Sequence, residues 1–537
     1  MIRCLLFFAI LGFGWIVNNH AFTSVLPTPH NTRYYVSPKG EDKKGNGSYR
    51  KPFKTLAYAA SKVPSNEGAT IELSAGTFIE TKPTLLPLGV SIMGAGQEKT
   101  ILSSTGVSYP DGVAENKLWY DGSLVQLVSP HYSIAKDTGS MVIAPAEGNQ
   151  EISGFTIDGN NKKLKAGVWV ENRNNVTMHH VSFKNLDQRG AVFSPGEKRF
   201  YSYPKYYMRN IRVFDCSFIN CGKDLPDETL GNLCIAQLDG AALYNITIKD
   251  NEGYGIKFIH DGYFINTSIH DCKIELNETD SKWGEDIAIE LWNNGPGNKI
   301  YNIHCNTWLS IVNHEGMFAG PKETENMKVH DIRMIDQDGV SNKEAVEIGA
   351  PGVEVYSSYF ENKGIGIAIW DMGRENIIIR NNIFHNSVIH DNWSGAPAVY
   401  IDNSRNWDFK NIRIYNNIFD QVQYGVRIKG NRIFDIQIKN NVFLSTTVAD
   451  VASTGQRVSF GNNLKFKGNS NDWVLTGVEQ VGTNIIQDPG FLQKGNRWAS
   501  YYKPASNKVA VVDKGVDVQM PFKGEAPDIG RWEFEKY

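Results

Sequence analysis

This chain of 537 residues has few cysteines, a small net charge and few long apolar segments. Each of these features excludes some classes of protein. The six cysteines show no paired C-x-x-C spacing, so the sequence indicates neither a dense disulfide framework nor a zinc site. A formal net charge of −3 gives no support for a nucleic-acid partner. With 41 % hydrophobic and 21 % charged residues, the composition is typical of a soluble globular protein and excludes disorder and collagen.

One apolar run stands at the amino terminus, where Arg3 precedes the apolar stretch from Cys4 to Val17 and polar Asn18 follows. This order and length predict a secretory signal in residues 1–24, although an uncleaved amino-terminal anchor is the alternative. A linker is expected over 25–32. The mature protein is therefore expected to be secreted or periplasmic, without a membrane span.

An Asn-Asn-apolar-Phe phrase recurs at 380–384, 415–419 and 439–443, with a weaker copy at 461–464. A phrase repeated at roughly fixed spacing is typical of stacked structural units, each of which packs on its neighbours. The sequence therefore predicts a solenoid.

Short strand cores recur through the chain at intervals of 22 to 35 residues. A coil of three short strands and three turns needs about this many residues. The cysteines in this slot are interpreted as a buried ladder, and the asparagines as an amide ladder from coil to coil. The aligned positions are Val181, Cys216, Ile246, Cys272, Cys305, Ile332, Ser358, Asn382, Asn417, Asn441 and Asn463.

A second strand is expected in each coil, rich in Val and Ile at alternate positions. Alternate residues of a strand point to opposite faces, so the Val and Ile side chains should fill the interior and the residues between them should form one outward face. The expected strands are 167–171, 235–239, 255–259, 287–290, 309–312, 346–348, 367–371, 399–402 and 426–429.

Both ends of the chain carry further signals. Thr55 can cap a short helix that runs to Val63, and strands are expected at 69–73 and 77–80. The phrase at 52–56, Pro-Phe-Lys-Thr-Leu, resembles the amino-terminal portion of secreted parallel β-helix proteins, and the phrase at 526–533 resembles their tail.

Together these features resemble the pectin-lyase-like right-handed parallel β-helix superfamily over most of residues 33–537. The resemblance implies an all-β fold, a right-handed single-stranded parallel β-helix of about ten or more coils, with a short amino-terminal capping helix. The expected divisions are an amino-terminal cap and first coils (33–110), a β-helix with loop insertions (111–465), and carboxy-terminal coils and cap (466–537). A monomer is expected.

The same resemblance implies carbohydrate-active chemistry, because polysaccharide lyases, glycoside hydrolases and uronan epimerases all use this scaffold. It does not choose among them, since function belongs to the site and not to the fold. No signature phrase of a lyase, epimerase or polygalacturonase subfamily is intact, so no catalytic residue is carried over.

Candidate site residues come from the outward column of the second strand. Tryptophans beside carboxylates suggest sugar binding, because rings stack on apolar sugar faces and carboxylates bond hydroxyls. The alternative is a solvated ladder of cross-strand charge pairs. The catalytic candidates are Glu290, Glu347, Asp371, Lys257 and His314, and the substrate-binding candidates are Asp239, His260, Trp292, Trp370, Tyr400, Arg427, Arg199 and Tyr203.

Two chemistries fit these residues. Hydrolysis needs a carboxyl pair, which Glu290, Glu347 and Asp371 could supply. Elimination at a uronic acid needs a base such as Lys257, His260 or His314. It also needs Arg427 or a hard cation to neutralise the substrate carboxylate.

We predict a secreted enzyme that cleaves an acidic or sulfated polysaccharide, with hydrolysis ahead of elimination. The acidic substrate is suggested by the aromatic and basic stretch 198–209. A non-catalytic carbohydrate-binding or adhesion solenoid is the rival from a different class. No cofactor is required; Ca²⁺ held by Asp239, Glu290 and Glu347 is an option, although no EF-hand-like loop is present.

Overall fold

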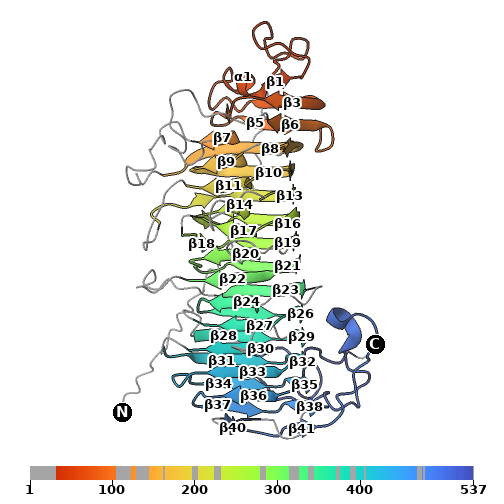
Figure 1. Cartoon of the computed structure of the whole chain (residues 1–537). Coiled ribbons are helices and arrows are strands. Elements are labelled where there is room, and N and C mark those ends of the chain that lie inside the picture. Colours follow the sequence, from red (N-terminus) through yellow and green to blue (C-terminus); the bar gives the residue numbers. More distant parts are fainter. Residues whose placement is uncertain are drawn as a thin grey trace, which may run out of the picture.

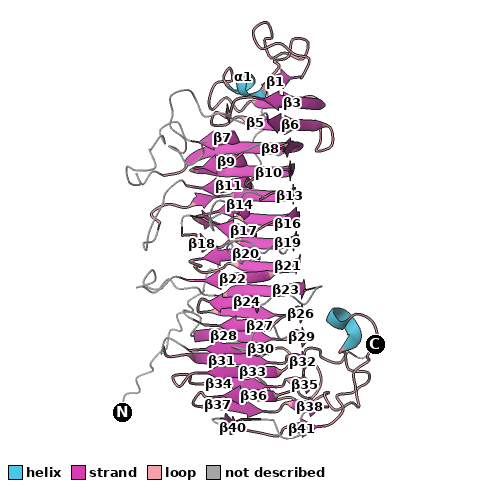
Figure 2. Ribbon diagram, viewed as in Figure 1, coloured by secondary structure: helices cyan, strands magenta, loops and turns pink. Residues whose placement is uncertain are grey.

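A computed structural model describes residues 32–104, 122–128, 144–160, 164–195, 204–222, 231–259, 261–277, 286–313, 326–336, 344–370, 375–387, 395–403, 407–468, 474–475 and 478–535. The described residues form one long stack of strands, with helix α1 (Leu56–Ala60) at one end (Figure 1). Strands make up almost all of the regular structure (Figure 2). A single turn of π-helix, Arg497–Tyr501, is the other helical element of the described part.

The largest sheet has 24 strands, all paired in parallel, and consists of two ladders that merge where one long strand serves both. The first ladder contains β1 (Arg33–Val36), β2 (Thr70–Leu73), β5 (Ser91–Gly94), β25 (Val353–Tyr356), β28 (Glu375–Arg380), β31 (Lys410–Tyr415), β34 (Ile436–Lys439), β37 (Val458–Gly461) and β40 (Val478–Gln480).

The second ladder contains β3 (Gly76–Glu80), β6 (Thr100–Ser104), β26 (Tyr359–Glu361), β29 (Ile383–His385), β32 (Ile418–Asp420), β35 (Val442–Leu444), β38 (Leu464–Phe466) and β41 (Ile485–Ile486). The long strands that join the ladders are β8 (Ala146–Asp158), β10 (Arg173–Lys184), β13 (Ile211–Ile219), β16 (Ala242–Asn251), β19 (Ser268–Leu276), β21 (Lys299–Cys305) and β23 (Met327–Ile335).

A separate parallel sheet has 14 strands, and its strands follow one another in chain order from coil to coil. They are β4 (Thr84–Leu85), β7 (Ser123–Val128), β9 (Ala166–Glu171), β11 (Arg189–Ser194), β14 (Gly231–Ile235), β17 (Tyr254–Phe258), β20 (Ile287–Trp292), β22 (Trp308–Val312), β24 (Glu344–Gly349), β27 (Ile365–Ile369), β30 (Pro397–Asp402), β33 (Tyr424–Lys429), β36 (Ala449–Ser453) and β39 (Val474–Leu475).

Three short strands, β12 (Met208–Arg209), β15 (Leu238–Asp239) and β18 (Phe264–Ile265), form a third parallel sheet. Stacked coils that pair only in parallel define a parallel β-helix, as the sequence predicted. Such parallel connections wind right-handed in nearly all proteins.

The second asparagine of each repeated phrase forms the predicted ladder. Asn417 Oδ1 accepts the Asn382 backbone N–H at 3.0 Å and the Asn382 Nδ2–H at 3.1 Å, and Asn441 stands in the same relation to Asn417. The ladder continues through Asn463, and these side chains are buried. Each amide satisfies a buried N–H at a bend of the coil, which is why the position favours asparagine.

The first asparagine of the phrase has a different task. Asn381, Asn416 and Asn440 adopt positive φ angles of 55 to 57°, a region that asparagine tolerates better than most residues. Their side-chain amides bind the carboxy-terminal segment: Asn381 Nδ2 donates to Arg531 O at 2.8 Å, and Asn416 Nδ2 to Asp528 O at 2.9 Å. The outer asparagines therefore tie the tail to the solenoid.

The phenylalanine of the phrase fills the interior. The rings of Phe360, Phe384, Phe419 and Phe443 stack along the axis at centroid distances of 4.9 to 5.3 Å. A Cβ at Gly366 or Gly425 would collide with the ring of Phe384 or Phe443, respectively. Glycine in the 14-stranded sheet thus makes room for a ring from the opposite wall.

The five described cysteines are buried and unpaired, as expected, but one lies out of the predicted slot. Cys216 pairs with Ile246, and Cys272 pairs with Ile303, so Cys305 lies two residues further on, opposite Ile274. The predicted marker was therefore wrong at this coil. Both Ile303 and Cys305 point inward, and local alternation could not choose between them.

Residues 235–239 are not one strand of the 14-stranded sheet, contrary to prediction. That sheet takes β14, and the chain bends at Gln237, whose φ is 51°, before Leu238 and Asp239 join the three-stranded sheet. Strand β11 also belongs to the 14-stranded sheet and was not predicted. At the amino terminus, Thr55 caps α1 by accepting the Tyr58 N–H, and the helix ends at Ala60, three residues earlier than expected.

The carboxy-terminal segment runs back beside the last coils (Figure 1). Its buried side chains pack against the second ladder, on which Tyr359, Ile383, Ile418, Val442 and Leu464 form a continuous apolar strip. The segment contributes Phe491, Tyr502, Val511, Val512 and Ile529 to this cluster. A second hydrophobic core therefore lies outside the cylinder.

Candidate active site

The candidate residues meet on the outward face of the 14-stranded sheet. Strand pairing places Lys257 beside Glu290, Glu290 beside Ser310, and Ser310 beside Glu347, on four successive coils. Three of the four had been predicted as site residues, and Ser310 had not. The row is largely enclosed, with Lys257 4 %, Glu290 6 % and Ser310 1 % exposed, whereas Glu347 keeps partial exposure.

Lys257 lies at one end of this row. Its ammonium forms a buried ion pair with Glu290 Oε2 and lies 3.9 Å from the centre of the Tyr254 ring and 4.5 Å from that of Phe258. A buried cation is tolerated where a carboxylate and ring faces replace its water. Lys257 is thus held rigidly against Glu290.

Glu290 is held from both sides of its carboxylate. One oxygen meets Lys257, and the other accepts the Trp292 indole N–H at 3.1 Å. Trp292 also stacks on Phe258, with ring centroids 4.6 Å apart. The alternating Glu-Leu-Trp order puts the carboxylate and the indole on the same side of strand β20.

Glu347 has the same kind of indole partner, but among the described residues no cation pairs with it. Trp370 Nε1–H donates to Glu347 Oε1 at 2.7 Å, and the Ser310 hydroxyl donates to Oε2. Burial, with Glu344 and Glu290 nearby, raises the pKa of Glu347 to about 7, and the two hydrogen bonds only partly oppose this. A carboxyl group with this pKa can give up a proton at neutral pH.

The two carboxyl groups are separated by one intervening strand, which carries Ser310. Adjacent strands lie about 4.8 Å apart, so the backbones of Glu290 and Glu347 are separated by about 10 Å. Inverting glycosidases hold their carboxyl groups about 6.5–9.5 Å apart, and retaining enzymes about 5 Å.

Tyr400 and Arg427 continue the same column beyond Ala368. Tyr400 is fully buried, and its hydroxyl donates to Asp402 Oδ2 at 2.8 Å. Burial first, and then Asp402, raise the pKa of Tyr400. Arg427 lies over the Tyr424 ring at 5.1 Å. These residues lie in the predicted column, two or more coils from Glu347.

Asp239 is not part of this column. It belongs to β15 of the three-stranded sheet, where its carboxylate pairs with Arg209 Nε at 3.0 Å. The set of Asp239, Glu290 and Glu347 that was considered for Ca²⁺ therefore does not converge. In the described ranges no group of three or more His, Cys, Asp or Glu side chains could hold a metal ion.

Five predicted site residues lie outside the described residues. They are Asp371, His314, His260, Arg199 and Tyr203. The structure therefore says nothing of their positions.

The part of the chain that the structure describes contains no helix long and apolar enough to cross a membrane.

Sequence reasoning missed contributors to the site. Glu344, on the same strand as Glu347, is 4 % exposed and helps to raise the pKa of Glu347. Tyr254 lies under the Lys257 ammonium. Glu344 stands three residues before Glu347, and Tyr254 three residues before Lys257, each at the start of its strand. Strict alternation would place residues three apart on opposite faces of a strand, so neither contact was predicted.

Comparison with known protein families finds one match, to part of the chain. Residues 38–211 match a family described as "Protein of unknown function (DUF1565)". No curated protein matches the chain.

Solved structures resemble the chain over most of its length. Pectate lyase Pel9A is 14 % identical, with a TM-score of 0.31, over 94 % of this chain and 96 % of that one. The A-module of Azotobacter vinelandii mannuronan C-5 epimerase AlgE6 is 13 % identical, with a TM-score of 0.33, over 81 % and 93 %. The tailspike protein of E. coli bacteriophage HK620, in complex with a pentasaccharide, is 12 % identical, with a TM-score of 0.46, over 84 % and 78 %.

Identities and TM-scores this low carry no conclusion about activity. The stacked parallel coils described above make the chain a parallel β-helix protein.

Proposed function

We propose that this protein is a polysaccharide-cleaving enzyme, a glycoside hydrolase that uses Glu347 as its acid and Glu290 as its base. The observation that carries the proposal is the carboxyl pair itself. Glu347 has a pKa raised to about 7, two coils from a second carboxylate that is paired with Lys257. A carboxyl group that keeps its proton near neutral pH suits the acid role, and a carboxylate held in an ion pair nearby is the candidate base.

The roles follow from the contacts. Glu347 would give its proton to the glycosidic oxygen as the bond to the anomeric carbon breaks. Water would attack that carbon from the opposite face, and its proton would pass to Glu290. The indole N–H of Trp370 and the hydroxyl of Ser310 hold the Glu347 carboxyl in place and stabilise the carboxylate that forms.

An acidic or sulfated polysaccharide is the proposed substrate. Arg427 supplies positive charge in the column, and the indoles of Trp292 and Trp370 lie beside the two carboxyl groups. Apolar sugar faces pack on such rings, while cations select anionic sugars. Residues 1–24 are proposed to direct secretion.

Elimination is the second candidate reaction, with Lys257 as the base. Its ammonium already contacts the Glu290 carboxylate and two ring faces. This ion pair would have to break before Lys257 Nζ could reach a proton of the substrate. This contact favours hydrolysis. A non-catalytic carbohydrate-binding solenoid is the remaining candidate.

The test is incubation with a panel of uronate and sulfated polysaccharides, while reducing ends and the ultraviolet absorbance of unsaturated uronides are followed together. Reducing ends without absorbance are expected. Absorbance would show elimination and overturn the hydrolase assignment. Binding without either product would favour the adhesion protein.

A further inference from the structure

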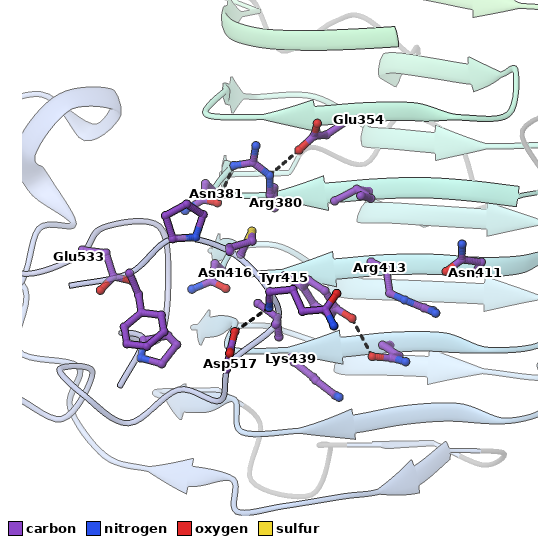
Figure 3. Close-up of a pocket in the computed structure, with 18 of the residues that line it drawn as sticks. Glu354, Arg380, Asn381, Asn411, Arg413, Tyr415, Asn416, Lys439, Asp517 and Glu533 are labelled. Carbon is purple, nitrogen blue, oxygen red and sulfur yellow. Dashed lines mark hydrogen bonds and ion pairs between the residues drawn. The ribbon is translucent and has the colours of Figure 1, made fainter. Parts of the chain in front are cut away.

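A cavity of about 990 Å³ lies outside the candidate active site, and none of its lining residues belongs to the 14-stranded sheet (Figure 3). It opens between the first ladder of the large sheet and the carboxy-terminal segment. Strands β25, β28, β31 and β34 supply one wall, and residues 517–522 supply the other. A volume of this size suits a ligand of a few sugar rings.

The wall on the solenoid is polar. It presents the side chains of Arg413, Tyr415, Gln437 and Lys439. The Tyr415 hydroxyl donates to Gln437 Oε1 at 2.7 Å, and Arg413 pairs with Asp435 at 2.9 Å, so these groups are ordered and still offer further donors.

The opposite wall is mostly apolar. Val518, Met520, Pro521 and Phe522 face the cavity from the tail. Phe522 is 40 % exposed, so part of its ring is open to a ligand in the cavity. One polar and one apolar wall match a sugar ring, which has hydroxyls at its rim and C–H groups on its faces.

The tail wall is fixed before any ligand arrives. The Val516 N–H donates to Asn440 Oδ1 at 2.9 Å, and Asn440 Nδ2 donates back to Val516 O at 2.8 Å. The Gln519 N–H closes a turn on Asp517 Oδ1 at 2.7 Å. A preformed cavity loses less conformational entropy on binding.

The cavity is lined by the cations Lys328, Arg380, Arg413 and Lys439 and by the carboxylates of Glu354, Asp517 and Glu533. Glu354 is engaged by Arg380 at 2.5 Å and lies 3.9 Å from Lys328. Glu533 accepts the N–H groups of Lys523 and Asp528. Among the described residues no carboxylate pairs with Lys439, which points to an anionic group on the ligand.

We propose that this cavity is a second carbohydrate site that takes a short acidic oligosaccharide. The sugar carboxylate would meet Lys439 and Arg413, and one ring would lie on Phe522. The proposal does not rest on hydrolysis at Glu347, because the cavity shares no residue or sheet with that site.

Isothermal titration of the full chain carrying E347Q tests the site without turnover of the ligand. The probes are tri-galacturonate and the neutral trisaccharide maltotriose. We expect measurable binding of the acidic probe and at least tenfold weaker binding of the neutral one. K439A and F522A should each weaken tri-galacturonate at least tenfold, and K439R should restore it.

The matched controls are K249A, an exposed lysine elsewhere on the solenoid, and Y49A, an exposed aromatic near its amino-terminal end. Both should bind like the parent. Unchanged affinity in K439A and F522A, equal affinity for the two probes, or no binding at all would overturn the proposal. Absence of turnover in the wild-type protein would count against the hydrolase and not against this site.

Discussion

Glu347 is the proposed catalytic acid, and its raised pKa also makes the stability of the folded protein depend on pH. Burial raises that pKa from an ordinary value of 4.5 to about 7. Below pH 4.5 the native and unfolded states both keep the proton. Between pH 4.5 and 7 the unfolded state releases it and the native state does not, so the wild-type protein loses stability as the pH rises.

E347Q removes this titration. The midpoint of thermal unfolding of E347Q, relative to wild type, should therefore be higher above pH 7 than near pH 4.5. Midpoints measured at several pH values check this, with E275Q, at a carboxylate on the large sheet, as the control. A difference that does not change with pH would show that Glu347 titrates normally.

Lys257 makes a second prediction at the residue scale. K257M would leave the Glu290 carboxylate buried without its cation. The loss should be about 3–5 kcal/mol in the free energy of unfolding, measured by denaturant titration. The double variant K257M/E290Q should recover much of it, since no charge stays unpaired. Equal stability of the single and double variants would argue against the coupling.

At the scale of elements, the asparagine ladder should contribute measurably to stability. N417A removes the oxygen that accepts both the backbone and side-chain N–H groups of Asn382. Leaving buried donors unpaired costs about 1–3 kcal/mol each. Denaturant titration should show a loss of about 2–6 kcal/mol for the two donors, against little change for N277A, at an exposed asparagine. A neutral N417A would contradict the ladder's structural role.

Repetition explains how much of these elements the sequence could predict. The Asn-Asn-apolar-Phe phrase located the ladder, and Val and Ile alternation located most strands of the 14-stranded sheet. The errors fell where repetition is weak. Cys305 and Ile303 both point inward, and Gln237 bends the chain between two sheets, so neither choice was encoded in local periodicity.

A row of outward rings was also missed. His179, Phe214, Tyr244, His270, Tyr301, His330 and Tyr356 stack on successive coils with centroid distances of 4.5 to 5.0 Å. The residue types differ from coil to coil, and only the register of the coils shows that they share a column. Their faces cover one another, so the row stabilises stacking and leaves ring edges to solvent.

At the scale of the whole molecule, the tail and the solenoid depend on each other. N416G removes two hydrogen bonds to the tail, from Asn416 Nδ2 to Asp528 O and Gly530 O, and glycine still tolerates the φ of 56°. Limited proteolysis followed by mass spectrometry should show faster cleavage within the tail.

The matched control is N302G, which has a similar φ of 52° and lies far from the tail in the stack. Its tail should be cut at the wild-type rate. If N416G is also cut at that rate, the outer asparagines do not hold the tail.

The tail also explains why the cavity between it and the first ladder could not be predicted. Its walls come from strands at 353–439 and from residues 517–522, and nothing in either sequence indicates that the tail folds back. The carboxylate column was easier to find, because a single repeated strand carries it. Its enclosure was not predicted, since burial of outward residues depends on segments distant in sequence.

The central claim is that Glu347 donates the proton in glycosidic cleavage, and reducing-end release by wild type and E347Q across pH tests it most directly. Wild-type activity should fall as the pH rises through about 7, because the acid loses its proton. E347Q, if folded, should be slower by about 100- to 10,000-fold below pH 7, and the fall in rate above pH 7 should be absent from it. Wild-type rates in a folded E347Q would contradict the claim.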